Sequence, residues 1–295
     1  MIPARRAFSL IELVVVIGII GVLMGLILPA IQRVRKTTAR TQCLNRLHQL
    51  ALALHQYNDA NGSLPPGITG DRDRLFPSMA WPARLLPYIE QSALWEDARR
   101  DYANQHSPFV PRQHSGLSAV VGTFHCPSDP RIDSAQDTHN GFRVAMTSFV
   151  GNLGLDYESK DGVLMLDSKV KLTDISDGTS GTLLVGERPP SDDFWYGWWY
   201  AGHGQASTGS VDMLIGARER NLGQDLVGFC PKGPFHFVSG SLGTYCDVLH
   251  YWSLHPGGAN FAFCDGSVRF LAYSADPIMP ALATRAGGES VQPPG

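Results

Sequence analysis

Cysteine and histidine side chains give this chain its clearest candidates for metal or redox chemistry. The 295 residues include five cysteines, and the segment between Cys230 and Cys246 is short and rich in glycine. We expect these two to form a disulfide in an oxidising compartment. Zinc ligation is the alternative, although the spacing of the ligands would be irregular, through Cys230, His236, Cys246 and His250. The odd number of cysteines leaves at least one thiol unpaired.

His255 and Asp265 form a second candidate pair, for metal binding or catalysis. Nine residues separate them, and Gly266 follows the aspartate. A structural interpretation competes with this one. Pro256 and the glycines after it make a turn, His255 bonds to nearby backbone, and Asp265-Gly266 closes a two-residue hairpin. We favour the structural interpretation.

Oxygen ligands for calcium could come from the polar loop around Gly178, where Asp174 and Asp177 lie close to Thr179. The spacing matches no defined calcium loop. Turn formation or helix capping explains the same residue types. Asp174 and Asp177 therefore stay weak calcium candidates, and we expect no required cofactor.

The densest aromatic run is Phe194–Tyr200, in which only Gly197 is not aromatic. Such rings can stack on sugars or fill a subunit interface. Alternating aromatic residues are also typical of a strand with one buried side, and we favour that structural role. No nucleophile elbow, phosphate loop or metalloprotease motif is present, so we expect no enzymatic activity.

The elements that position these residues begin with a segment that resembles a membrane span. An uncharged run extends from Leu13 to Ile31, directly after Glu12. At about 1.5 Å per residue it is roughly 28 Å long, close to the hydrocarbon thickness of a bilayer. A plain signal anchor and a removable export signal, suggested by Arg5 and Arg6, are the simple interpretations. Neither explains a carboxylate that needs a partner near lipid.

The same stretch resembles the N-terminus of type IV prepilins and type II secretion pseudopilins. In these proteins a leader is cut before the apolar helix, the first mature residue is usually Phe and the fifth is Glu. The resemblance implies that a prepilin peptidase cuts between Ala7 and Phe8, and that Phe8 is methylated. Glu12 would then pair with the amine of a neighbouring helix during assembly. Ala7 replaces the glycine that is usual before the cut.

Past the apolar run, one-sided spacing predicts that the helix continues. Apolar residues recur three and four positions apart until Asn61-Gly62, followed by two prolines, ends the pattern. Pro29 is the expected site of a bend. The stripe consists of Leu44, Leu47, Ala51, Leu54 and Tyr57. The segments are then a leader (1–7), a transmembrane and assembly helix (8–31), its amphipathic continuation (32–61), a β-rich head (62–285) and a flexible tail (286–295).

In the head, a helix is predicted over Trp81–Tyr102, with Pro87 breaking its start. Short apolar runs bounded by Gly, Asp and Pro then predict strands. The candidates are Val120–Cys126, Val144–Val150, Thr182–Glu187, Phe194–Tyr200, and a hairpin of Ala259–Cys264 with Ser267–Ala272.

Several blocks of the chain, taken in order, resemble a large bacterial family of pseudopilin-like proteins whose heads have no assigned activity. The blocks are Gln42–Leu47, Leu54–Tyr57, Leu64–Gly67, Leu86–Gln91, Phe124–Asp129, Asp174–Ser180, Thr182–Glu187, and His255 through Asp265-Gly266. The resemblance implies an α+β, pilin-like fold in which one long N-terminal helix packs on a β-rich globular head. It supplies no catalytic residue.

Charge and composition bound the function. Net charge is −3 and charged residues make up 17%, which argues against nucleic-acid binding. The basic residues from Arg33 to Arg46 are expected to contact lipid headgroups. They outnumber Arg5 and Arg6, so a positive-inside count would place the head in the cytoplasm. The family resemblance implies the reverse: a single span in the inner membrane, a cytoplasmic N-terminus and an extracytoplasmic head.

The expected function is a cleaved and N-methylated prepilin-like subunit in a pilus-like or type II secretion-associated structure. Its expected partners are the prepilin peptidase, membrane lipid, and copies of itself or other pseudopilins. The alternative is a surface-displayed binding protein that uses the helix only as an anchor and contacts glycans through Phe194–Tyr200.

Overall fold

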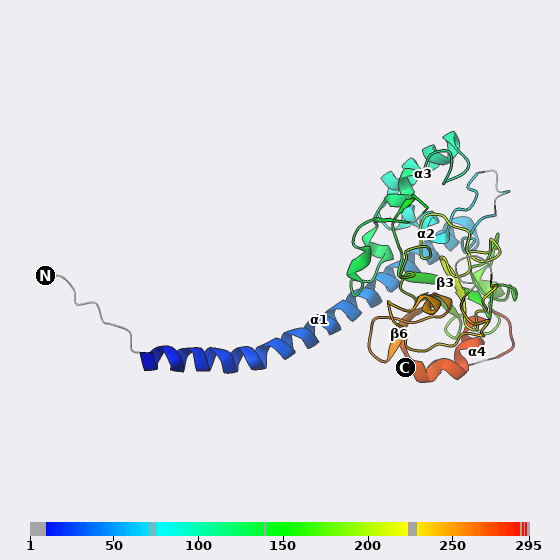
Figure 1. Cartoon of the computed structure of the whole chain (residues 1–295). Coiled ribbons are helices and arrows are strands. Elements are labelled where there is room, and N and C mark those ends of the chain that lie inside the picture. The colour runs from blue at the N-terminus through cyan, green and yellow to red at the C-terminus, as the bar shows by residue number, and fades with distance from the viewer. Residues whose placement is uncertain are drawn as a thin grey trace.

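The computed structural model describes residues 10–70, 72, 75–138, 140–223, 229–289, 291 and 293. Its longest element is α1 (Leu10–Asn61), a continuous helix of 52 residues that projects from the head and then enters it (Figure 1). The prediction of one long helix is confirmed. Pro29 lies inside the helix, and Figure 1 shows α1 bending between its projecting part and the head, as expected of a helix that contains proline.

The second part of α1 buries an apolar stripe in the head. Cys43, Leu47 and Leu54 are fully buried, while Leu44 and Tyr57 at the edges of the stripe are half-buried. Every described side chain from Leu10 to Thr38 is exposed, so the packed part of the helix begins near Ala39. The packed part therefore lies within the predicted continuation of the helix, 32–61.

Five strands form the central sheet of the head, in the order β5-β3-β4-β6-β7. Strands β3 and β5 run parallel, and the other neighbours are antiparallel. The strands are β3 (Phe149–Gly154), β4 (Leu183–Glu187), β5 (Leu214–Gly216), β6 (Gly258–Phe263) and β7 (Val268–Ala272). A separate two-stranded sheet pairs β1 (Gln136–Asp137) with β2 (Arg143–Val144).

Both faces of the central sheet are covered. One apolar cluster joins residues of the sheet to Leu47 and Leu54 of α1, and α1 packs on β6, β4 and β7. A second cluster joins Phe261 and Phe263 of β6 to Met279 and Leu282 of α4 (Met279–Ala283). Because both faces are covered, β3, β4 and β6 are buried along their whole lengths.

The predicted helix over Trp81–Tyr102 is divided into three pieces. These are α2 (Trp81–Arg84), a 3-10 turn η1 (Leu86–Tyr88) and α3 (Ser92–Asn104). Pro87 lies inside η1, and Glu90 adopts a φ of 62°, so the chain turns between η1 and α3. Further 3-10 turns are η2 (Ser115–Ser118), η3 (Gly122–Phe124), η4 (Pro130–Ile132), η5 (Leu172–Asp174), η7 (Tyr245–Leu249) and η8 (Tyr273–Ile278).

Two of the predicted strands are wrong. Val120–Cys126 contains the 3-10 turn η3, and Phe194–Tyr200 forms bends with one isolated bridge, between Met146 and Trp198. Val144–Val150 spans the end of β2, an irregular link and the start of β3, whereas Thr182–Glu187 coincides with β4 apart from its first residue. The short strand β5 was not predicted.

The hairpin of β6 and β7 is confirmed, but its loop differs from the prediction. Phe263 accepts a hydrogen bond from the Gly266 N–H and donates one to Ser267, so three residues (264–266) form the loop. Gly266 adopts a φ of 84°, which is the left-handed residue that a three-residue hairpin loop requires.

Candidate functional site

The projecting part of α1 is an exposed apolar rod. Of the helices that the structure describes, α1 is the one long and apolar enough to cross a membrane, and none of its apolar window is buried. The exposed stretch from Leu10 to Thr38 is about 44 Å long at 1.5 Å per residue, which matches a hydrocarbon core with its headgroup regions. Glu12 lies exposed in the first described turn. Ala7 and Phe8, the predicted cleavage and methylation sites, and the leader 1–7 lie outside the described residues.

The basic segment after the span divides between solvent and head. Arg35 and Lys36 are exposed and remain available to lipid headgroups. The guanidinium of Arg40 lies 3.5 Å from the ring centroid of Phe270, and Arg46 Nη1 donates to the carbonyl of His125. The expectation that the whole cluster contacts lipid is therefore wrong for Arg40 and Arg46, which fix the helix to the head.

Four buried side chains meet where α1 enters the head. Cys43 of α1 is disulfide-bonded to Cys126, which was not anticipated. His255 Nε2 lies 3.2 Å from Glu187 Oε1 and 3.6 Å from Cys126 Sγ. The backbone N–H and the side-chain amide of Asn260 donate to Glu187 at 2.7 and 3.0 Å. His255 thus bonds to a carboxylate, and not to nearby backbone as predicted.

Asp265 does not join His255 in this cluster. Its carboxylate accepts hydrogen bonds from the N–H and the hydroxyl of Ser267, two residues along the hairpin loop, and it is exposed. His255 and Asp265 therefore have different partners, and the alternative of a joint metal or catalytic site, which was not favoured, gains no support. The hairpin role of Asp265 and Gly266 stands.

The second disulfide joins Cys230 to Cys246, with an S–S distance of 2.04 Å and a Cα–Cα distance of 5.6 Å. This is the pairing expected from the short segment between them, and it removes both thiolates from the alternative zinc set. The two histidines of that set have carboxylate partners: His236 Nδ1 lies 2.9 Å from Asp276 and His250 Nε2 lies 3.1 Å from Asp247.

The two calcium candidates bind backbone. Asp174 accepts from the N–H of Lys171 and so caps η5. Asp177 accepts from the N–H groups of Gly287 and Gly288, at 2.6 and 3.0 Å. The start of the predicted flexible tail is therefore held against the head.

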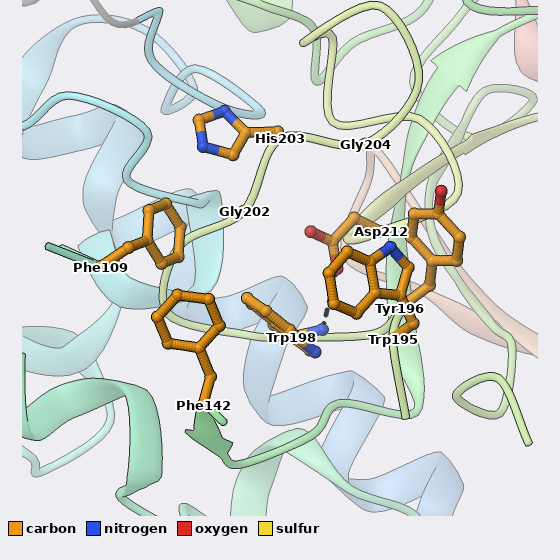
Figure 2. A pocket seen from close by; sticks show the side chains of 9 residues that line it. All are labelled: Phe109, Phe142, Trp195, Tyr196, Trp198, Gly202, His203, Gly204 and Asp212. Atoms are coloured by element: carbon orange, nitrogen blue, oxygen red, sulfur yellow. Dashed lines mark hydrogen bonds between the residues drawn. The ribbon is translucent and has the colours of Figure 1, made fainter. Parts of the chain in front are cut away.

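The aromatic run opens onto a pocket of about 350 Å³. Figure 2 shows Phe109 and His203 on one side of it, Trp195 and Asp212 on the other, and Trp198 between them. Phe142, Tyr196, Gly202 and Gly204 complete the lining. Trp199 points elsewhere: it is fully buried, and its ring packs on Phe124 at 5.0 Å. An apolar hollow with a few polar groups is typical of small-ligand sites.

Residues Phe194–Tyr200 do not form the predicted strand, because two of their backbone N–H groups bond to the carboxylate of Asp212 and not to a neighbouring strand. Asp212 Oδ1 accepts hydrogen bonds from the N–H groups of Gly197 and Trp198, at 3.0 and 2.9 Å. These bonds hold the run in bends, and Gly197 adopts a φ of 108°. Burial raises the pKa of Asp212 to about 6, and the two N–H donors oppose that rise.

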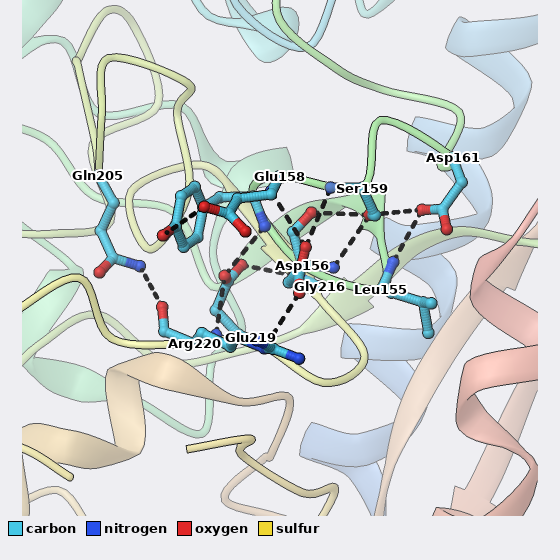
Figure 3. Close-up of polar contacts among 10 residues, drawn as sticks. Leu155, Asp156, Glu158, Ser159, Asp161, Gln205, Gly216, Glu219 and Arg220 are labelled. Atoms are coloured by element: carbon cyan, nitrogen blue, oxygen red, sulfur yellow. Dashed lines mark hydrogen bonds and ion pairs between the residues drawn. The ribbon is translucent and has the colours of Figure 1, made fainter. Parts of the chain in front are cut away.

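A second buried acid holds the loops beside β5 (Figure 3). Glu219 accepts hydrogen bonds from the N–H groups of Tyr157, Gly216 and Arg220, at 3.0 to 3.2 Å. Asp156 pairs with the guanidinium of Arg220 at 3.3 Å. Burial raises the pKa of the Glu219 carboxyl to about 7. Both oxygens of this carboxylate face backbone donors, which indicates a structural role.

No local pattern in the chain indicates the partners in these sites. Phe109, Phe142 and Asp212 come from three separate segments, and each reaches the pocket only through the tertiary fold. Glu187 ends both a predicted strand and a family block, and neither pattern indicates its contact with His255.

Two family models match the chain. Residues 32–278 match the family described as protein of unknown function (DUF1559). Residues 2–28 match the prokaryotic N-terminal methylation motif. Neither a curated protein nor a solved structure matches the chain.

Proposed function

Since the chain belongs to the DUF1559 family of proteins of unknown function and carries a prokaryotic N-terminal methylation motif, we propose that it is a membrane-anchored pseudopilin subunit. A prepilin peptidase cuts between Ala7 and Phe8, Phe8 is N-methylated, and the helices of several subunits assemble into a pilus-like or type II secretion-associated structure. The observation that carries the proposal is the exposed apolar rod of α1, fixed at one end to a folded head.

Glu12 gives the rod a specific contact. It is the only charged residue between Leu10 and Ile31, and a carboxylate in hydrocarbon is costly unless it is paired. The amine that cleavage creates on Phe8 of a neighbouring subunit is a suitable partner. Pairing then favours association of helices over dispersed monomers in the bilayer.

The head is placed outside the cytoplasm, on the far side of the inner membrane. The two disulfides of the head support this orientation, because disulfides persist in oxidising compartments and are rare in the cytoplasm. The number of basic residues after the span argues for the opposite orientation, but two of them, Arg40 and Arg46, contact the head and are not free to face the membrane surface. Large domains also translocate largely regardless of charge.

Two measurements test the proposal. Mass spectrometry of the membrane form should find a methylated Phe8 at the N-terminus. An intact Met1, or a cut beyond Ile31, would overturn it. A photo-crosslinker at Val16 in cells should join copies of the chain, or join the chain to another pseudopilin. A crosslinker at the exposed Gln49, on the head half of α1, serves as the matched control. Equal yields at both positions would count against assembly through the projecting helix.

The aromatic pocket favours a second candidate, a displayed binding protein in which α1 is only an anchor. Trp195, Phe109 and Phe142 offer ring faces, and His203 and Asp212 lie at the same hollow (Figure 2). Rings beside polar groups suit the stacking and hydrogen bonding of a sugar. Neither candidate assigns a catalytic residue to the head. Binding of the detergent-solubilised chain to immobilised glycans, without self-crosslinking through α1 in cells, would favour this second candidate over the first.

A further inference from the structure

The junction between α1 and the head brings together four potential metal ligands. The thiol positions of Cys43 and Cys126, the Glu187 carboxylate and the His255 imidazole each offer one atom, and these atoms all lie within 4.8 Å of one another. All four residues are buried. They come from four sequence segments that are far apart: the middle of α1, the loop after η3, the end of β4 and the turn before β6. This is the one such group among the residues that the structure describes.

The spacing of these atoms agrees with tetrahedral zinc. Zinc binds Cys sulfur at about 2.3 Å and His nitrogen or carboxylate oxygen at about 2.0–2.2 Å, so tetrahedral angles give ligand separations of about 3.5 Å for S···N and about 3.4 Å for N···O. The observed separations are 3.6 Å from Cys126 Sγ to His255 Nε2 and 3.2 Å from His255 Nε2 to Glu187 Oε1. The S···N and N···O distances therefore already lie close to those expected between ligands of one zinc ion.

The distance between the two sulfurs does not match a metal site, because Cys43 and Cys126 are disulfide-bonded. Bonded sulfurs lie about 2 Å apart, whereas two thiolates on one zinc lie about 3.8 Å apart. Both sulfurs belong to buried side chains, and a small cavity of about 10 Å³ adjoins Cys126 and Glu187. That space lies beside two of the four ligands.

We propose that Cys43, Cys126, Glu187 and His255 form a redox-gated site for a thiophilic divalent cation of the zinc type. The oxidised state is the disulfide, and the reduced state binds the metal. Both cysteines are synthesised as thiols, so the reduced state precedes the disulfide, and the four ligands come together when the head folds.

The chemistry balances in two steps. A dithiol reductant transfers two electrons and two protons, which breaks the Cys43–Cys126 bond, leaves two thiols and converts the reductant to its own disulfide. The divalent cation then displaces one proton from each thiol, and both protons go to solvent. Glu187 binds as a carboxylate and His255 through Nε2.

Asn260 supports the carboxylate ligand. Its backbone N–H donates to Oε2 of Glu187, and its side-chain amide donates to Oε1, which fixes the plane of the carboxylate. Metal ligands are usually oriented by such second partners. On the other side of Cys126, its backbone N–H donates to the Ser148 hydroxyl at 2.9 Å.

The test uses Co²⁺ as a spectroscopic probe and Zn²⁺ as the competitor. The full chain in detergent carries Cys230→Ser and Cys246→Ser, so that only the proposed site and the buried Cys264 keep thiols. After reduction and removal of the reductant under argon, one equivalent of Co²⁺ should produce thiolate-to-cobalt charge transfer and tetrahedral d–d bands. One equivalent of Zn²⁺ should remove both.

Variants decide which residues bind. Cys43→Ser or Cys126→Ser should abolish the two-thiolate spectrum, and Cys264→Ser should leave it unchanged. Glu187→Gln should weaken binding by more than about 100-fold, because loss of a second-shell partner alone costs about 10- to 100-fold. His255→Cys should keep the metal and add a third thiolate to the charge-transfer band, a gain that a purely structural histidine would not give.

Zn²⁺ should also slow the re-formation of the Cys43–Cys126 disulfide when oxidised glutathione is added to the reduced, unsubstituted chain. Mass mapping of the disulfides at successive times measures the rate. This second measurement needs no substitution. Absence of charge transfer in the reduced double variant would overturn the proposal, as would a spectrum that survives Cys43→Ser. Re-oxidation at the same rate with and without Zn²⁺ would do so too.

Discussion

Cys43 in the long helix and Cys126 in the head are covalently joined, with their Cα atoms 5.0 Å apart and 83 positions apart in the sequence. The bond lies where α1 begins to pack on the head. It makes the helix a covalent part of the head as well as a packed one.

Removal of this disulfide should cost more stability than removal of the other one. In the chain-entropy description, a loop of 83 residues stabilises by about 4.5 kcal/mol and a loop of 16 residues by about 3 kcal/mol. Denaturant unfolding of Cys43→Ala/Cys126→Ala should therefore show the larger loss, with Cys230→Ala/Cys246→Ala as the comparison. An equal or larger loss in the second pair would contradict the expected order.

Truncation of the buried helix stripe should destabilise the head. Leu47 is fully buried in the cluster that joins α1 to the sheet, so Leu47→Ala should lower the free energy of unfolding by about 2–5 kcal/mol. Leu52 lies on the same helix but is 55% exposed, so Leu52→Ala is the matched control. This substitution should change the free energy of unfolding by less than about 0.5 kcal/mol. Similar losses in both variants would mean that the stripe is not the packed face.

The contribution of Asp212 and Glu219 to stability should fall between about pH 4 and pH 7. Burial raises the carboxyl pKa of Asp212 to about 6 and that of Glu219 to about 7, so over this range the folded chain keeps protons that the unfolded chain has released. These two carboxyl groups therefore stabilise the fold less as pH rises through the window, by up to a few kcal/mol. Burial lowers the pKa of His114 and His125, which acts in the opposite direction, so the contribution of one carboxyl group has to be isolated.

The check is the difference in unfolding free energy between the unsubstituted chain and Glu219→Gln. This difference should decline from pH 4 to pH 7 and level off above pH 7. A difference that grows with pH would show that the folded carboxyl has a lowered pKa.

Glycan binding, where it occurs, should depend on Trp195. This half-buried ring lines the pocket beside Asp212, so Trp195→Ala should weaken binding by about tenfold or more, a loss of 1.4 kcal/mol. Phe229→Ala removes an exposed aromatic ring that is not part of the pocket lining and serves as the control. Trp199→Ala would be a poor probe, because that ring is in the core. Equal effects of Trp195→Ala and Phe229→Ala would indicate nonspecific adhesion.

Assembly should depend on Glu12. Glu12→Ala removes the proposed partner of the Phe8 amine, so the self-crosslinked fraction from Val16 should fall by about tenfold or more. Glu96→Ala, which removes an exposed carboxylate of the head, should leave the fraction unchanged. Unchanged crosslinking in Glu12→Ala would remove the pairing from the assembly mechanism.

The elements predicted well are those that local pattern determines. The apolar residues from Leu44 to Tyr57 recur three and four positions apart, which places them on one face of a helix and does not fit a strand. In the structure they all lie in α1. The apolar runs on either side of Asp265-Gly266 fold back as β6 and β7. Even here the loop length was wrong, because whether Cys264 belongs to the strand or to the loop depends on pairing across the hairpin.

The elements predicted poorly depend on distant partners. Phe194–Tyr200 has the composition of a strand, but the carboxylate of Asp212 takes its N–H groups in place of a neighbouring strand. The partner of Cys43 was not predictable, because an amphipathic helix gives no sign of which loop will cover it. The same holds for Glu187 and His255, which meet only when the sheet has formed.

The way α1 enters the head has a mechanical consequence. An axial pull on the projecting rod would load the stripe of α1 in shear against β4, β6 and β7, where many contacts must slide together before any is lost. The covalent bond at Cys43 lies at the entrance, so it would bear tension before the stripe does. Tension on the projecting rod would therefore reach the head through a covalent bond before it loads the packed stripe.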